Sequence, residues 1–89
     1  MGSNQEVLDG QEAQRILDSD VYKNAIQKLA DGYQNQWMNS RPNDVAEREM
    51  AYKKLQILAD FVTEVKTVME TGKMAEKQVS TEEHIGTHY

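Results

Sequence analysis

The residues with the clearest spacing for chemistry are His84 and His88. Two histidines four residues apart on a helix can share a metal ion, and Glu83 adjoins the pair. Gly86 lies between the two histidines, however, and no third or fourth ligand accompanies them. We therefore interpret residues 79–89 as a polar, flexible tail and expect no metal site.

Groups suited to catalysis are equally sparse. Carboxylates are plentiful, but no pattern places two of them in a desolvated pocket, as acid–base catalysis requires. Ser19, Ser40 and Ser80 read as cap or turn residues, and no histidine lies in the segment expected to fold that would activate them. We expect a protein that is not an enzyme, with no catalytic residue, cofactor or small-molecule substrate.

The net charge of the chain makes nucleic acid an unfavourable main partner. Fifteen acidic and ten basic residues give a net charge of −5, whereas phosphate binding needs a basic surface. Basic residues gather around one segment, but Glu47 and Glu49 are interleaved with them, so a solvated helix face is the favoured interpretation. These basic residues are Arg41, Arg48, Lys53 and Lys54.

Length and composition limit the chain to one small domain. A chain of 89 residues buries only about 60% of its unfolded surface, and without cysteine it has no disulfide to compensate. No apolar run approaches the roughly 20 residues of a membrane span, and the start lacks a secretion signal. The start resembles a myristoylation signal, except that Glu6 stands where Ser or Thr is required. We expect a soluble intracellular protein without membrane attachment.

The pattern along the chain predicts an all-α fold with an antiparallel helical hairpin. Capping pairs at Asp9 with Glu12 and at Asp44 with Glu47 mark two helix starts, and Ser19 marks a third. Pro42 interrupts the helices, and Gly72 is a natural stop. We predict a short helix over residues 10–17 and a hairpin of residues 19–39 and 44–71. A flexible lead-in over 1–8 precedes a single domain over 9–78.

The long helix carries an apolar row with alternating steps of four and three residues. Folding the chain back at residues 41–43 pairs positions whose numbers sum to about 84, because facing helices rise equally. Every resulting pair is apolar, and Trp37 falls opposite Glu47 and Arg48. The row consists of Ala51, Leu55, Leu58, Val62, Val65 and Met69, and the pairs are Tyr33–Ala51, Leu29–Leu55, Ile26–Leu58 and Tyr22–Val62.

A second apolar row lies beside the first and consists of Met50, Ile57, Phe61 and Val68. An amphipathic helix gains stability by burying such a face, so this second row needs a cover. In one alternative the short N-terminal helix covers it with Val7, Leu8 and Ala13. In the favoured alternative it is a protein interface with a second copy or another protein, and a symmetric dimer then forms a four-helix bundle. Lys54 and Glu64 interrupt the second row, which suits a partner surface better than a dry core.

The combined pattern of residues 13–78 resembles small α-helical proteins encoded among the structural and packaging genes of tailed bacteriophages and prophages. The residues that carry the resemblance are Ile16-Leu17-Asp18-Ser19, then Tyr33, Trp37, Ser40, Pro42, Asp44, Arg48-Glu49, Tyr52, Leu55 and Leu58, and finally Gly72-Lys73 and Ala75-Glu76-Lys77. The resemblance implies a phage setting, in the host cytoplasm or associated with the virion. It implies no catalytic residues.

These observations lead to one functional hypothesis and two alternatives. The hypothesis is a non-enzymatic, self-associating helical protein of phage or prophage origin, accessory to virion assembly or DNA packaging. The first alternative is a monomeric adaptor or inhibitor that binds a host or phage enzyme. The second is a small nucleic-acid-binding module of the packaging machinery, with Arg48 and Lys53 contacting DNA.

Overall fold

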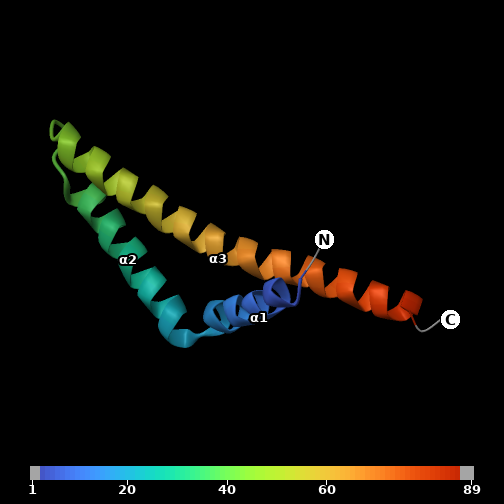
Figure 1. Cartoon of the computed structure of the whole chain (residues 1–89). Coiled ribbons are helices and arrows are strands. Elements are labelled where there is room, and N and C mark those ends of the chain that lie inside the picture. The colour runs from blue at the N-terminus through green and yellow to red at the C-terminus, as the bar shows by residue number, and fades with distance from the viewer. Residues whose placement is uncertain (1–2, 87–89) are drawn as a thin grey trace. The chain divides into compact units, whose positions relative to one another are not determined.

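The computed structural model describes the backbone of residues 3–86 and the side chains of residues 3–80, and these residues form helices without any strand (Figure 1). The helices are α1 (Asn4–Asp18), α2 (Asp20–Asn39) and α3 (Val45–Gly86). The predicted all-α class is confirmed. The chain separates into two compact units, described here one at a time: α1 with α3 from Glu64 onward, and Ser19–Thr63.

Helix α1 begins earlier than the sequence predicted because Ser3 and Glu6 form a reciprocal cap. The Glu6 N–H donates to Ser3 Oγ over 3.2 Å, and the Ser3 N–H donates to Glu6 Oε1 over 3.0 Å. This capping box satisfies two backbone donors at the helix start. The predicted start at Gly10 is therefore wrong, and residues 4–8 of the expected lead-in are helical. Asp9 instead accepts a hydrogen bond from the Gln5 side chain within the helix.

Helix α2 has the boundaries that the sequence predicted. Ser19 has an extended backbone and its Oγ accepts from the Tyr22 N–H over 3.3 Å, so the chain stops one helix and starts the next at this residue. At the other end the Ser40 N–H donates to the Trp37 carbonyl over 3.3 Å. Gly32 is accommodated inside the helix.

Helix α3 begins at the predicted place with half of the predicted capping pair. The Glu47 N–H donates to Asp44 Oδ1 over 3.2 Å, as an N-cap requires. The Glu47 carboxylate does not return to Asp44. It accepts from Gln36 Nε2 over 3.0 Å, while the Asp44 N–H donates to the Arg41 carbonyl. Glu47 thus ties α3 to α2 instead of closing the cap.

Gly72 does not end α3, and the predicted boundary at residue 71 is wrong. The helix continues to Gly86, and no described residue has a positive φ, so Gly72 lacks the left-handed conformation of a C-terminal stop. Gly72 is buried against Gly10 of α1, where the absence of a side chain allows close approach. The helix also takes in residues 79–86 of the expected tail, whose flexibility stays a prediction.

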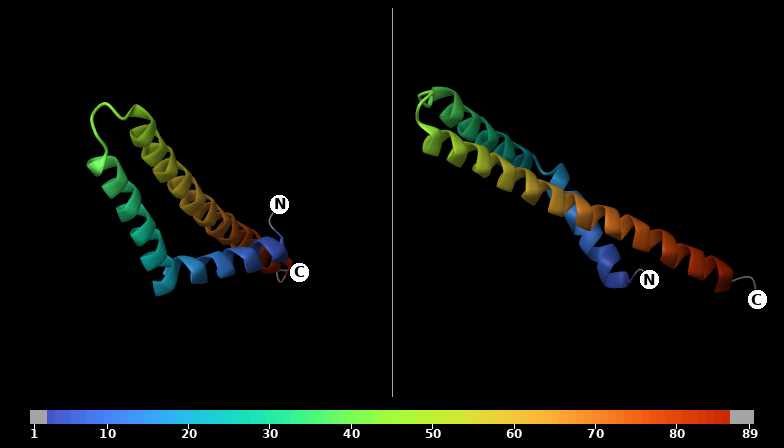
Figure 2. Two further views of the ribbon diagram at one scale, coloured as in Figure 1. Left: turned by 90° about the vertical axis from the view of Figure 1, so that its left-hand side faces the viewer. Right: turned by 90° about the horizontal axis from the view of Figure 1, so that it is seen from above.

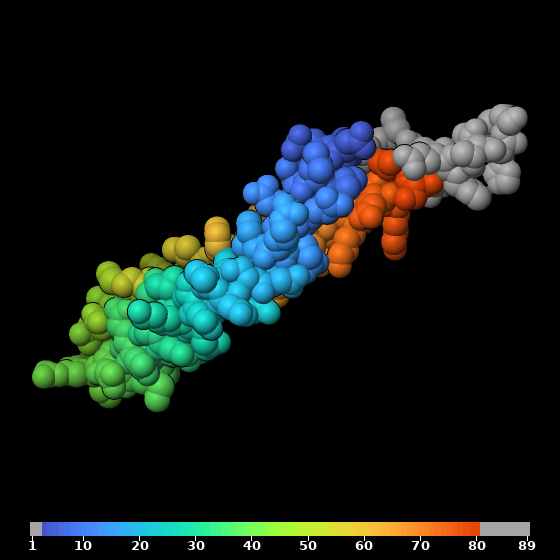
Figure 3. All heavy atoms as spheres, turned by 90° about the horizontal axis from the view of Figure 1, so that it is seen from below, coloured from blue at the N-terminus to red at the C-terminus, as the bar shows by residue number. Residues whose placement is uncertain are grey.

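In the unit Ser19–Thr63, α2 and the first part of α3 run antiparallel from the turn at residues 40–44 (Figure 2). Two contacts across the turn have residue numbers whose sums lie within one of the predicted value of about 84, which confirms the register there. They join Gln36 to Glu47 and Trp37 to Arg48, while the long Lys54 side chain reaches the Tyr33 ring from one turn further along α3. In the space-filling view, α2 lies over this part of α3 (Figure 3).

The predicted apolar pairing is confirmed in burial for most of its members. Of the eight paired residues, Ala51 is fully buried, six are half-buried and one is exposed. The exception is Leu29, which is exposed while its neighbour Ala30 is half-buried. The half-buried members are Tyr22, Ile26, Tyr33, Leu55, Leu58 and Val62. At this point of α2, Ala30 and not Leu29 is therefore the residue turned toward α3.

Candidate interaction surface

The second row lies on the surface of α3. Successive residues of a helix are 100° apart, so the face that buries Ala51 turns Met50 aside from α2. The exposed fractions are 53% for Met50, 67% for Ile57, 55% for Phe61 and 40% for Val68, whereas Ala51 has none. The hairpin therefore uses the first row and leaves the second uncovered. That the second row is a protein interface stays a prediction.

In the unit that joins α1 to α3 from Glu64 onward, Val68 is the member of the second row that lies beside α1. Within their unit, Ala13 is 5% exposed and lines an open groove with Ile16, Val65 and Val68. Of the other residues predicted to form a cover, Val7 is half-buried and Leu8 is exposed. Within this unit, the alternative in which the N-terminal helix covers the second row is supported at Val68.

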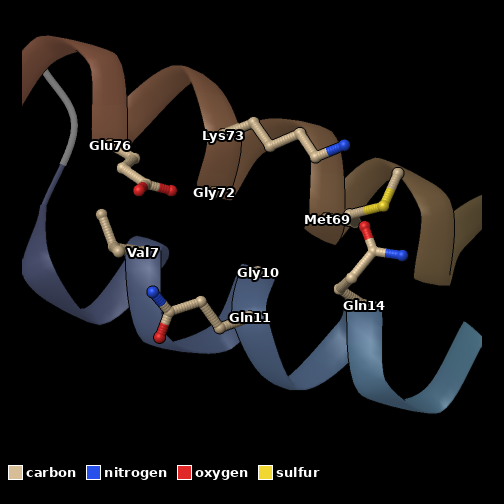
Figure 4. Close-up of a pocket in the computed structure, with 8 residues that line it drawn as sticks. All are labelled: Val7, Gly10, Gln11, Gln14, Met69, Gly72, Lys73 and Glu76. Atoms are coloured by element: carbon tan, nitrogen blue, oxygen red, sulfur yellow. The ribbon is translucent and has the colours of Figure 1, made fainter. Parts of the chain in front are cut away.

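The contact that holds α1 on α3 is a crossing of two glycines (Figure 4). A Cβ atom built on Gly72 would lie 2.5 Å from Gly10 Cα and 2.9 Å from the Glu6 carbonyl oxygen. Ala75, one turn further along α3, is 2% exposed. Small residues at these positions let the two backbones touch. Val7, Gln11, Gln14, Met69, Lys73 and Glu76 surround the crossing.

The spacing of α3 beyond Val65 holds a signal that sequence reasoning missed. Small or apolar residues recur there in steps of three and four at Val68, Gly72, Ala75 and Val79, and the last three are buried or half-buried in the unit with α1. Interpreting Gly72 as a stop ended the helix too early. In the unit Ser19–Thr63, the second-row residues Met50, Ile57 and Phe61 stay exposed beside the hairpin.

A second exposed cluster lies at the turn of the hairpin. The Arg48 guanidinium lies 4.4 Å from the centre of the Trp37 ring, which confirms that Trp37 faces Arg48. Trp37, Pro42, Val45, Arg48, Glu49 and Tyr52 line an open groove of about 300 Å³ here. Trp37, Val45 and Tyr52 are all exposed. Trp, Tyr and Arg are enriched among the residues that dominate binding at interfaces, so this turn cluster is a second candidate interaction surface.

The described residues hold no constellation for metal or membrane chemistry. Among them, no three His, Asp or Glu side chains gather as a metal site would require. The side chain of His84 and the whole of His88 lie outside the described residues. No described helix combines the length and apolar character needed to cross a membrane.

Comparison with known proteins identifies no relative from which a role could be transferred. No family model matches the chain, and neither the curated proteins nor the solved structures include a significant match.

Proposed function

We propose that this chain is a non-enzymatic helical interaction protein that self-associates through Met50, Ile57 and Phe61. The observation that supports the proposal is the exposure of these three large apolar side chains on a helix whose opposite face α2 already covers. Two hairpins joined in this way make a four-helix bundle, the usual solution for helices with an unburied apolar stripe.

The thin core of a single chain supports the same proposal. Among residues 3–80 the buried apolar side chains are alanines, namely Ala13, Ala51 and Ala75. Full burial of a large apolar side chain contributes about 1.5–3 kcal/mol relative to exposure. Ile57 and Phe61 are 67% and 55% exposed, so covering them in both copies adds part of this contribution four times, against the cost of bringing two chains together.

The biological setting of the proposal rests on the sequence resemblance. It suggests a protein of phage or prophage origin in the host cell or virion, accessory to virion assembly or DNA packaging. In that setting the self-associated form presents its turn clusters to other assembly proteins. Nucleic acid is a weaker candidate partner because of the net charge of −5.

The test compares two single substitutions by sedimentation velocity at tens of micromolar. Phe61→Glu places a charge within the second row and should convert a dimer to a monomer. Val21→Glu is the matched control, because Val21 is 80% exposed on α2 and belongs to neither row. This control should remain dimeric. A monomeric native chain, or equal sedimentation of all three proteins, would remove self-association.

The turn cluster favours one second candidate, a monomeric adaptor that binds an enzyme of host or phage. Exposed Trp37 and Tyr52 flank a groove in which Arg48 is already held against an aromatic ring. Trp, Tyr and Arg are the residues that most often dominate binding energy at interfaces. Trp37→Ala should abolish a complex isolated from infected cells under this candidate, and Phe61→Glu should leave that complex intact.

A further inference from the structure

We propose that two copies of the chain join through antiparallel α3 helices in one register, with Ile57 of each copy against Phe61 of the other. This inference rests on the proposed self-association and adds its direction and register. It starts from the second row together with the two charged residues that interrupt it. The complete row is Met50, Lys54, Ile57, Phe61, Glu64 and Val68.

The complete row has the spacing of a coiled-coil seam. Its steps alternate between four and three residues along one continuous helix, so its members occupy successive a and d positions of a heptad. Lys54, Phe61 and Val68 then share the a position, while Met50, Ile57 and Glu64 share the d position. Each a residue can form a layer with a d residue of an antiparallel partner.

The complete row is self-complementary about Ala59. Each apolar member has an apolar counterpart at the same distance on the other side of this residue, and Lys54 has Glu64 as its oppositely charged counterpart. Reversing the helix therefore places Met50 against Val68 and Ile57 against Phe61 of the second copy. Twofold symmetry repeats every layer, so both halves of the interface are satisfied together.

The two charged residues of the row decide between antiparallel and parallel pairing. In the antiparallel register Lys54 of each copy faces Glu64 of the other, so the opposite charges pair. In a parallel dimer, Lys54 would face Lys54 and Glu64 would face Glu64, and both layers would repel. A charged residue at a seam position is a known means of fixing the register of a coiled coil, at some cost in stability.

Lys54 lies between the hairpin and the seam. Its Nζ is 5.6 Å from the centre of the Tyr33 ring on α2, and the residue is half-buried. Pairing with Glu64 of the second copy therefore requires the long, flexible side chain to turn its ammonium group from Tyr33 to the rim of the seam.

The groove beside Val68 fits the outer layer of this register. Ala13, Ile16, Val65 and Val68 supply the apolar part of its lining, Asp9 and Glu12 complete it, and its volume is about 240 Å³. Methionine is the flexible apolar side chain best suited to an irregular groove. The register brings Met50 of the second copy to Val68, so this methionine is the occupant that we assign to the groove.

Cysteine pairing tests the register directly, because the native chain has no cysteine. Met50→Cys and Val68→Cys variants, mixed and oxidised in air, should form a disulfide-linked dimer of one copy of each. Either variant alone should remain unlinked, because its two cysteines would lie about 27 Å apart along the helix axis. Linkage of each variant with itself would show parallel pairing and overturn the proposal.

The molecular mass of the native chain in solution, measured before any oxidation, distinguishes a failure of self-association from a failure of the antiparallel register. A dimer that gives no mixed disulfide overturns the register alone, and self-association stands. A monomeric native chain overturns both.

Charge reversal provides a second test with a built-in control. Lys54→Glu or Glu64→Lys alone should raise the dimer dissociation constant by about tenfold or more, because each creates two like-charged layers. The mixture of both single variants should recover the native affinity, since every layer of the mixed dimer pairs Glu with Lys. Single variants that bind as tightly as the native chain, or a mixture that stays weak, would contradict the register.

Discussion

At the scale of single residues, Gly32 and Gly72 have different roles although each stands inside a long helix. A Cβ atom on Gly72 would collide with the backbone of α1, whereas one on Gly32 would meet no heavy atom within 4 Å. Both lie in helices, where helix propensity alone assigns each glycine the same free-energy cost relative to alanine. Only the neighbour across the crossing distinguishes them, which is why the sequence pattern gave Gly72 the wrong role.

Gly72→Ala should lower the free energy of unfolding by about 1–3 kcal/mol, since the added methyl meets backbone that cannot move aside as a side chain would. Gly32→Ala is the matched control and should raise it by up to about 1 kcal/mol, through better helix propensity. Urea unfolding followed by circular dichroism measures both changes. Equal effects of the same sign would show that α1 does not pack on Gly72.

At the scale of helices, the sequence predicted where α2 and α3 begin because their caps are local. Ser19 and Asp44 each accept a hydrogen bond from a backbone N–H three residues on. Ser3 and Glu6 have the same spacing, but the sequence prediction placed the first capping pair at Asp9 and Glu12 and treated residues 1–8 as a flexible lead-in. The end of α3 was harder to predict, because the role of Gly72 is decided by its contact with α1 and not by the conformational preference of glycine.

Ser3→Ala should shorten α1 at its start and lower the free energy of unfolding by about 1 kcal/mol, because the Glu6 N–H loses its acceptor. Ser80→Ala is the matched control on α3, where Ser80 is exposed within the helix. Its effect should stay within about 0.5 kcal/mol. Hydrogen exchange at the Glu6 amide, faster in Ser3→Ala alone, would locate the loss. Unchanged exchange would contradict the cap.

At the scale of the whole molecule, the second row was predictable from the sequence, but its partial cover was not. Periodicity identified Met50, Ile57, Phe61 and Val68 as one face. It could not show that α1 lies beside Val68 within its own unit, because that contact is set by the glycine crossing. All four residues of the second row are at least 40% exposed.

Self-association predicts that stability depends on protein concentration. Anything that binds the folded chain alone raises its apparent stability by mass action, and a second copy acts in this way. The thermal midpoint of the native chain should rise by several degrees over a hundredfold increase in concentration. The midpoint of Phe61→Glu should stay constant over the same range. Equal concentration dependence in both proteins would place the contact elsewhere.

The most direct test of the central claim is the mass of the native chain in solution, measured by light scattering during size exclusion. The account predicts twice the 10.2 kDa of a single chain at tens of micromolar. A mass of 10.2 kDa at every concentration, unchanged by Phe61→Glu, would contradict it.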